Sequence, residues 1–261
     1  MDLGLKGKTA LVLAGGGGLG RAIAQALAAE GAQVAVAGLH AESVDAAVAE
    51  IAATGAKALS LVWDLADLAA IDTNVTRVER ELGPVDILVN NSGGPPPTTA
   101  AGQAPELWMK HFQAMVLSVI ATTDRVLPGM RQRRWGRILT STSSGIVAPI
   151  PNLGLSNTLR SSLAGWSKTL SREVAQDGVT VNIVVPGRIA TGRTRFIDES
   201  RAKREGRSVD DVIAESHAGI PIGRYGDPQE YAAVVAFLAS ERAAYVTGSI
   251  VRVDGGAIPT I

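Results

Sequence analysis

The sequence predicts one α/β domain, built as a doubly wound parallel sheet of about seven strands with helices on both faces. Short apolar runs alternate along the chain with longer Ala-rich segments of helical spacing, which is typical of repeated strand–helix–strand units. Most runs are apolar throughout, as expected for strands covered on both sides. No Pro/Ser-rich linker and no internal repeat interrupts residues 1–261, which favours a single domain.

Each expected strand is one of these short apolar runs. The strands are predicted at Thr9–Leu13, Gln33–Ala37, Ala58–Trp63, Ile87–Asn90, Arg137–Ser141, Val179–Val185 and Ser249–Val253. The helices between them are predicted at Leu19–Glu30, Ala41–Ala53, Leu68–Leu82, Ala104–Arg133, Leu153–Gln176 and Pro228–Ser240. Parallel strands end at one edge of the sheet, and open α/β sheets bind their ligands at that edge.

The segment from Thr191 to Ile220 departs from this rhythm. It is polar and charged, and it is long for a connection between two elements of a compact domain. One interpretation is a helical lid over a site, at about residues 191–220. The other is a solvated surface excursion, and the sequence favours neither.

Composition excludes several functions. The 25 basic residues balance the 25 acidic ones, so no excess positive charge is available for a nucleic-acid backbone. The chain has no cysteine, and its histidines His40, His111 and His217 lack the short spacings of metal ligands, so we expect no metal site. No signal peptide or membrane-spanning run is indicated. We expect a cytoplasmic protein that binds neither membranes nor nucleic acid.

A glycine-rich loop is the first chemical signal. Residues 14–20 read Ala-Gly-Gly-Gly-Gly-Leu-Gly between the first expected strand and the first expected helix. In that position glycines let the backbone approach a diphosphate, and the N-terminus of the following helix faces the anion. The loop therefore predicts dinucleotide binding by Gly15, Gly17, Gly18, Leu19 and Gly20. The alternative is a merely flexible glycine loop.

Other polar residues follow the second, third and fourth expected strands. The second strand ends in Gly38-Leu39-His40, which carries neither the acid typical of NAD binding nor the base typical of NADP binding, so the preference between NAD and NADP stays open. Asp64 and Leu65 follow the third strand, with Asp64 placed to accept from an adenine amino group. Asn90, Ser92 and Gly93 end the fourth. All five are predicted cofactor contacts.

Several motifs resemble those of the short-chain dehydrogenases/reductases, over nearly the whole chain. Residues 90–93 (Asn-Asn-Ser-Gly) look like the family's NNAG element, and residues 220–228, 247–248 and 253–256 resemble the tail of the bacterial 3-oxoacyl-carrier-protein reductase branch. The resemblance implies a Rossmann-like fold, an active-site serine at Ser143, and nicotinamide contacts from Pro186, Gly187 and Thr191. It also implies a homodimer or homotetramer through the helices at 104–133 and 153–176, which keep apolar residues beyond the need of one sheet face: Met115, Leu163, Trp166 and Leu170.

The chain departs from the family at the positions that carry its chemistry. The family's tyrosine, thirteen residues after the serine, falls on Ser156, its lysine falls on Arg160, and its helical asparagine falls on Met115. The usual Thr-Gly at the start of the glycine loop is Leu13-Ala14. The three tyrosines, Tyr225, Tyr231 and Tyr245, all lie downstream, so we expect none near the site.

Two functions remain open. In the first, the protein is an NAD(P)-dependent oxidoreductase for a small carbonyl or alcohol substrate, with Ser143 and Ser156 orienting the carbonyl and Arg160 or a water stabilising the alkoxide. Arg160 is then also a cofactor contact. In the second, the fold binds a dinucleotide or ligand without oxidoreduction, as a sensor, partner subunit or non-redox enzyme. An aliphatic hydroxyl is a poorer proton donor than a phenol near a lysine, and a guanidinium does not relay protons.

Overall fold

Seven parallel strands form the centre of the molecule in a computed structural model that describes residues 2–260. They are β1 (Thr9–Val12), β2 (Gln33–Gly38), β3 (Ala58–Val62), β4 (Ile87–Asn90), β5 (Gly136–Ser141), β6 (Val179–Pro186) and β7 (Ile250–Val253), in the order β3-β2-β1-β4-β5-β6-β7. The chain crosses from β3 at one edge to β4 beside β1, so strand order reverses between β1 and β4. Such a switch leaves a crevice at the carboxyl ends of the strands.

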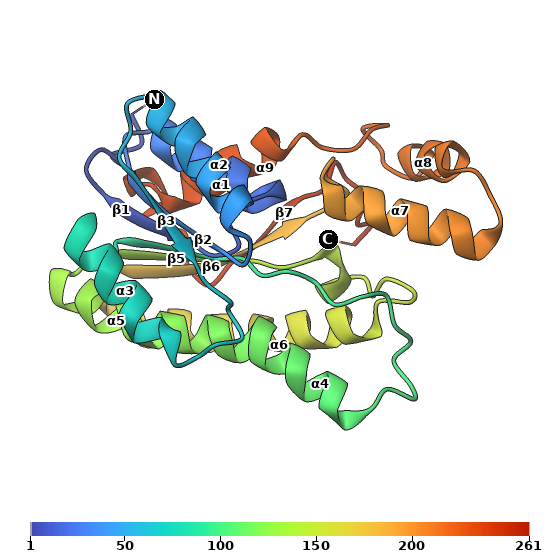
Figure 1. Ribbon diagram of the computed structural model, residues 1–261, viewed down its shortest axis with the longest axis horizontal. Coiled ribbons are helices and arrows are strands. Elements are labelled where there is room, and N and C mark those ends of the chain that lie inside the picture. Colours follow the sequence, from blue (N-terminus) through green and yellow to red (C-terminus); the bar gives the residue numbers. More distant parts are fainter. Residues whose placement is uncertain (1, 261) are drawn as a thin grey trace.

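Helices cover both faces of the sheet (Figure 1). One face carries α1 (Gly18–Ala29), α2 (Ala41–Ala53) and α9 (Pro228–Ala239), and the other carries α3 (Ala70–Glu81), α5 (Ser118–Arg133) and α6 (Gly154–Val174). Strand side chains alternate between the two cores: Val12 packs with the first face, whereas Leu11 and Leu13 pack with the second. The predicted doubly wound fold is confirmed.

The long helix predicted over 104–133 is interrupted. It consists of α4 (Pro105–Phe112), a π-helical turn (Gln113–Leu117) and α5, in continuous succession. Met115 lies in the π-helical turn and is buried against the apolar side of α6. Hydrophobic spacing predicts a helix here but does not reveal one widened turn within it.

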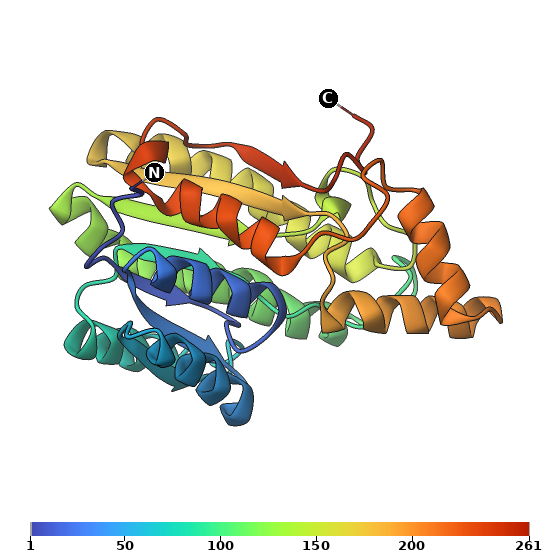
Figure 2. The same ribbon diagram turned by 90° about the horizontal axis from the view of Figure 1, so that it is seen from above.

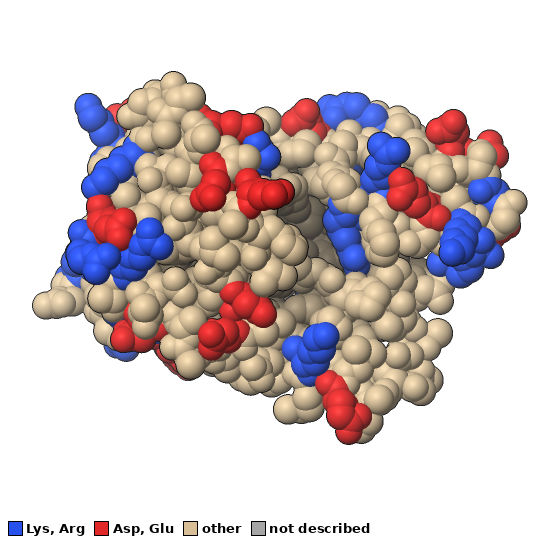
Figure 3. Space-filling model, in the orientation of Figure 1, with Lys and Arg blue, Asp and Glu red and all other residues tan. Residues whose placement is uncertain are grey.

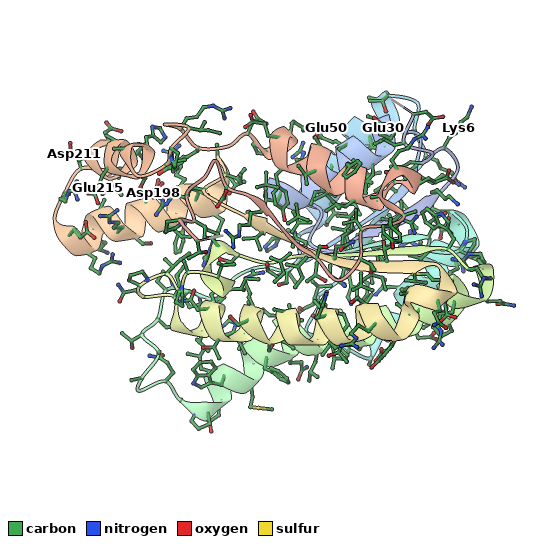
Figure 4. All side chains as sticks on the ribbon, turned by 180° about the vertical axis from the view of Figure 1, so that it is seen from behind. Lys6, Glu30, Glu50, Asp198, Asp211 and Glu215 are labelled. Atoms are coloured by element: carbon green, nitrogen blue, oxygen red, sulfur yellow. The ribbon has the colours of Figure 1, made fainter. Side chains whose placement is uncertain are left out.

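The segment 191–220 is helical. It forms α7 (Gly192–Glu205) and α8 (Val209–Ala218), which lie beyond the carboxyl ends of the strands (Figure 2). Arg201 of α7 and Arg207, in the turn between the two helices, form ion pairs with Glu215 of α8, and Figure 4 labels Glu215 and Asp198 in this region. α7 and α8 therefore form a small helical unit at the carboxyl edge of the sheet.

Within residues 2–260, no helix is long and apolar enough to cross a membrane. The same residues hold no group of three or more His, Cys, Asp or Glu side chains that could bind a metal ion.

Candidate active site

A cavity of about 430 Å³ opens at the carboxyl edge of the sheet, where the space-filling view shows a deep hollow (Figure 3). Its wall is assembled from five stretches of chain: the glycine loop, the turn after β4, the turn after β5 with the start of α6, the turn after β6, and the start of α7. The hollow therefore lies where the reversal of strand order predicts a ligand site.

The glycine loop divides into two parts with different roles. Gly17, Gly18 and Leu19 line the cavity, and a Cβ added to Gly17 would meet nothing within 4 Å. A Cβ on Gly20 would instead lie 2.2 Å from the carbonyl oxygen of Ala14. Gly20 thus lets helix α1 pack closely on the loop, while the exposed glycines leave an open cradle beside the N-terminus of α1. This cradle fits a diphosphate.

Ser143 follows β5 directly and faces the cavity. Its Oγ accepts a hydrogen bond from the backbone N–H of Gly145 at 3.1 Å, so its own proton stays available for a ligand oxygen. Ser156, in the first turn of α6, is buried and lines the same cavity, and its hydroxyl has no hydrogen-bond partner among residues 2–260. The site therefore holds two hydroxyl groups free to bind a ligand.

Arg160 lies one turn further along α6 and is only 8% exposed. Its Nη2 donates to the carbonyl oxygens of Ser92 at 3.1 Å and Gly93 at 3.2 Å, and its Nη1 to that of Ser141 at 3.4 Å. Burial, with the nearby positive charge of Arg193, lowers the pKa of Arg160 to about 10. The guanidinium stays charged at neutral pH and brings a fixed positive charge to the cavity.

Comparison with known proteins identifies the family of this chain. A sequence profile of the family described as enoyl-(acyl carrier protein) reductase matches residues 13–257. The 3-oxoacyl-[acyl-carrier-protein] reductase FabG of Escherichia coli K12 is 38% identical over 256 residues, which cover 97% of this chain and 98% of that protein. The chain belongs to the short-chain dehydrogenase/reductase family.

Two crystal structures of reductases are close to this fold. L-sorbose reductase from Gluconobacter frateurii, complexed with NADPH and L-sorbose, superposes with a TM-score of 0.94 at 32% identity, with 100% of each chain covered. A variant of the actinorhodin polyketide ketoreductase with NADPH superposes at 0.93, also at 32% identity, covering 97% of this chain and 98% of that one.

Most of the residues predicted for this short-chain dehydrogenase/reductase site share the one cavity. Those that line it are Gly17, Gly18, Leu19, Ser92, Gly93, Ser143, Ser156, Arg160, Pro186, Gly187 and Thr191. Thr191 meets the glycine loop directly, since a Cβ on Gly18 would lie 3.7 Å from Thr191 Cβ. The loop and the start of α7 thus face each other across the cavity.

Five predicted residues do not line the cavity: Gly15, Gly20, Asp64, Leu65 and Asn90. Asn90 is fully buried and donates from Nδ2 to Thr123 Oγ1 at 3.1 Å. Its neighbour Asn91 faces the cavity instead and donates to the carbonyl oxygen of Ala14 at 3.3 Å. Asp64 is exposed, and its Oδ1 accepts from the N–H of Ala66 at 2.9 Å, which closes a local turn.

Tyr231 corrects one expectation, because the sequence predicts no tyrosine near the site. Its side chain on α9 is fully buried, and its hydroxyl donates to Ser141 Oγ at 2.9 Å, a residue of the cavity wall. The hydroxyl also lies 3.1 Å from the carbonyl oxygen of Val184. Burial raises the pKa of Tyr231, so the phenol stays protonated and its hydrogen bond holds Ser141 in the cavity wall.

The residues that suggest an oligomer from the sequence are mostly internal. Met115, Leu163 and Leu170 are buried within one chain, and only Trp166 of the four is partly exposed. Met115, Leu163 and Leu170 are therefore ordinary core positions, and the prediction of a homodimer or homotetramer rests on the family resemblance.

Proposed function

We propose that this protein is an NAD(P)-dependent oxidoreductase that interconverts a small carbonyl compound and its alcohol with an altered set of catalytic residues. One observation carries the proposal: a single cavity joins the dinucleotide cradle at Gly17–Leu19 to Ser143, Ser156 and Arg160. The NADPH in the two related crystal structures supports the cofactor class. The preference between NAD and NADP stays open, because β2 ends in Gly38-Leu39-His40.

The bound nicotinamide would supply the hydride, and the chain's own groups would manage the carbonyl oxygen. Ser143 holds a proton that it can donate to that oxygen as a hydrogen bond. Arg160 brings a buried positive charge, which favours negative charge developing on the oxygen. Ser156 adds a second hydroxyl where the family has its phenol. Neither serine has the acidity of a phenol, so we expect slow turnover with a proton drawn finally from water.

A second candidate function is ligand binding without oxidoreduction. The replacement of the family's tyrosine and lysine by Ser156 and Arg160 favours it, because the usual proton donor is missing while the cradle remains open. A fluorescence titration with NADH and NADPH, followed by a panel of carbonyl substrates with the tighter cofactor, separates the two. Binding with turnover supports the oxidoreductase, binding without turnover supports the sensor or partner subunit, and the absence of binding contradicts both.

A substitution at Gly17 tests the cradle. Its φ of −161° is open to any residue and its Cβ direction is empty, so Gly17→Val should preserve the fold while filling the space for the diphosphate. We expect affinity for NADH and NADPH to fall by about tenfold or more, which corresponds to about 1.4 kcal/mol. Gly165→Val is the matched control, since that exposed glycine of α6 is also open and lies outside the cavity. An unchanged affinity in Gly17→Val would place the dinucleotide elsewhere.

We also propose that the chain assembles as a homodimer or homotetramer, on the strength of the family resemblance. Sedimentation velocity at micromolar concentration is expected to give a mass of two or four chains. A single monomeric species would contradict this.

A further inference from the structure

The charged side chains of the cavity wall all carry positive charge. Among residues 2–260, three arginines line it, Arg160, Arg188 and Arg193, and no Asp or Glu does. Arg188 is paired with the buried Asp198 of α7. Arg160 and Arg193 have no carboxylate within 4.0 Å among residues 2–260, so two unneutralised positive charges face the ligand space.

Both arginines reach the same short turn after β4. Arg160 donates to Ser92 and Gly93 from the α6 side, as described above. Arg193, in the first turn of α7, donates from Nη2 to the carbonyl oxygen of Pro95 at 2.7 Å, and a Cβ on Gly94 would lie 3.1 Å from the same nitrogen. The two guanidinium groups thus both donate to backbone carbonyls of this turn.

Most donors of Arg193 remain unused. A guanidinium offers five N–H donors. Within the described residues Arg193 makes a single hydrogen bond, the one to the carbonyl oxygen of Pro95. Partial burial lowers the pKa of Arg193, and its charge in turn lowers that of Arg160. An anion placed between them would relieve both the repulsion and the loss of hydration, and a planar carboxylate would match the free fork of donors.

We propose that Arg193 binds an acidic group of the substrate, so that the enzyme acts on carbonyl compounds that carry a carboxylate. This assignment rests on the proposed oxidoreductase function. The glycine loop and the N-terminus of α1 already form a cradle for the cofactor diphosphate. Arg193 instead contacts the turn after β4. Strand β4 neighbours β5 in the sheet, and Ser143 follows β5. Arg160 contacts the same turn and lines the cavity with Ser143 and Ser156, so an acid bound by Arg193 would share the cavity with the groups that orient the carbonyl.

The test compares acids with their esters. Pyruvate, acetoacetate and levulinate place a carboxylate at three distances from a ketone, and the methyl ester of each removes the charge. We expect the wild-type enzyme to favour at least one acid over its ester. Arg193→Ala should raise KM for that acid about 30-fold or more, the low end of the effect of removing a buried charge partner, and leave KM for the ester unchanged. Arg195→Ala is the control, because Arg195 is exposed on the same helix and paired with Glu199.

Three outcomes would overturn the assignment. Equal use of acid and ester by the wild type would show that the site does not recognise the carboxylate. An equal loss of activity with acid and ester in Arg193→Ala would show the same. A tenfold or greater loss of NADPH and NADH affinity in Arg193→Ala, with no discrimination between acid and ester, assigns the arginine to the cofactor diphosphate.

A binding measurement keeps this proposal separate from the proposed function. If no carbonyl is reduced, the shift in thermal midpoint caused by each acid and its ester, measured with and without NADPH, still tests the site. A rise with the acid that is absent with the ester, and absent in Arg193→Ala, supports the anion site even when oxidoreduction fails. No shift with any acid, in a protein that reduces neutral carbonyls, contradicts the anion site alone.

Discussion

Replacing Ser156 by tyrosine and Arg160 by lysine together is expected to raise the rate of carbonyl reduction about 10²-fold or more, the contribution of a positioned general acid. Both positions line the cavity, one turn apart on α6, so the two new groups would lie within reach of each other and of the substrate. A lysine ammonium lowers the pKa of a nearby phenol, so the tyrosine and lysine together form a proton donor. The present pair, the aliphatic hydroxyl of Ser156 and the guanidinium of Arg160, does not supply such a donor. Steady-state rates with saturating NADH or NADPH measure the gain.

The single substitutions Ser156→Tyr and Arg160→Lys should each do little, because the phenol needs the ammonium. A matched control places the same two changes elsewhere on α6, as Ser161→Tyr with Arg172→Lys, at exposed positions outside the cavity. If the double variant at 156 and 160 keeps its thermal midpoint and gains no rate, the binding-module function is favoured over the oxidoreductase.

The second large effect concerns the attachment of α7. Asp198 is fully buried, where its carboxylate pairs with Arg188 and accepts a hydrogen bond from the Tyr225 hydroxyl at 2.9 Å. Asp198→Ala leaves both partners without their acceptor. The loss of one member of a buried pair costs about 3–5 kcal/mol. Because Arg188 is one-third exposed, at 32%, solvent screens the pair and we expect a smaller loss, about 2–3 kcal/mol.

Chemical denaturation measures this free energy of unfolding, and hydrogen exchange locates it. Glu199→Ala is the control, since its pair with Arg195 lies on the surface of the same helix and contributes about 0.5 kcal/mol or less. Equal stabilities of the two variants would contradict the assigned role of Asp198. Faster exchange confined to α7 and α8 in Asp198→Ala would show that the buried pair fastens these helices to the sheet.

Much of the fold follows from the sequence, because strand and helix periodicities are local. The helix at Ala41–Ala53 and the strand at Ile87–Asn90 are predicted with the observed bounds. The ends of other elements move by one or two residues where a turn continues or frays. The π-helical turn was not predictable, because a single widened turn leaves the apolar spacing nearly unchanged.

The site is less accessible to sequence reasoning, since it depends on which way neighbouring side chains point. Asn90 and Asn91 are alike in the sequence, yet the pleat at the end of β4 buries one and directs the other to the cavity. Arg193 is one of many arginines in a charged segment with no apolar stripe to orient it. Tyr231 approaches Ser141 only because α9 packs across the sheet, a contact between segments far apart in the chain.

The contact between Gly18 and Thr191 has a consequence for how the protein folds. Gly18 comes from the first helix and Thr191 from the segment that precedes α7. Nearby, Gly187 packs closely against Asp254, because a Cβ added to Gly187 would lie 2.5 Å from Asp254 Cα. A nascent chain that has completed β1 to β5 still lacks the opposite wall of the cavity. Contacts of such long sequence separation form late and slowly, after the loop-closure entropy has been overcome. Dinucleotide binding should therefore appear as the final kinetic phase of refolding, and the ligand should slow unfolding of the complete domain without accelerating its early collapse.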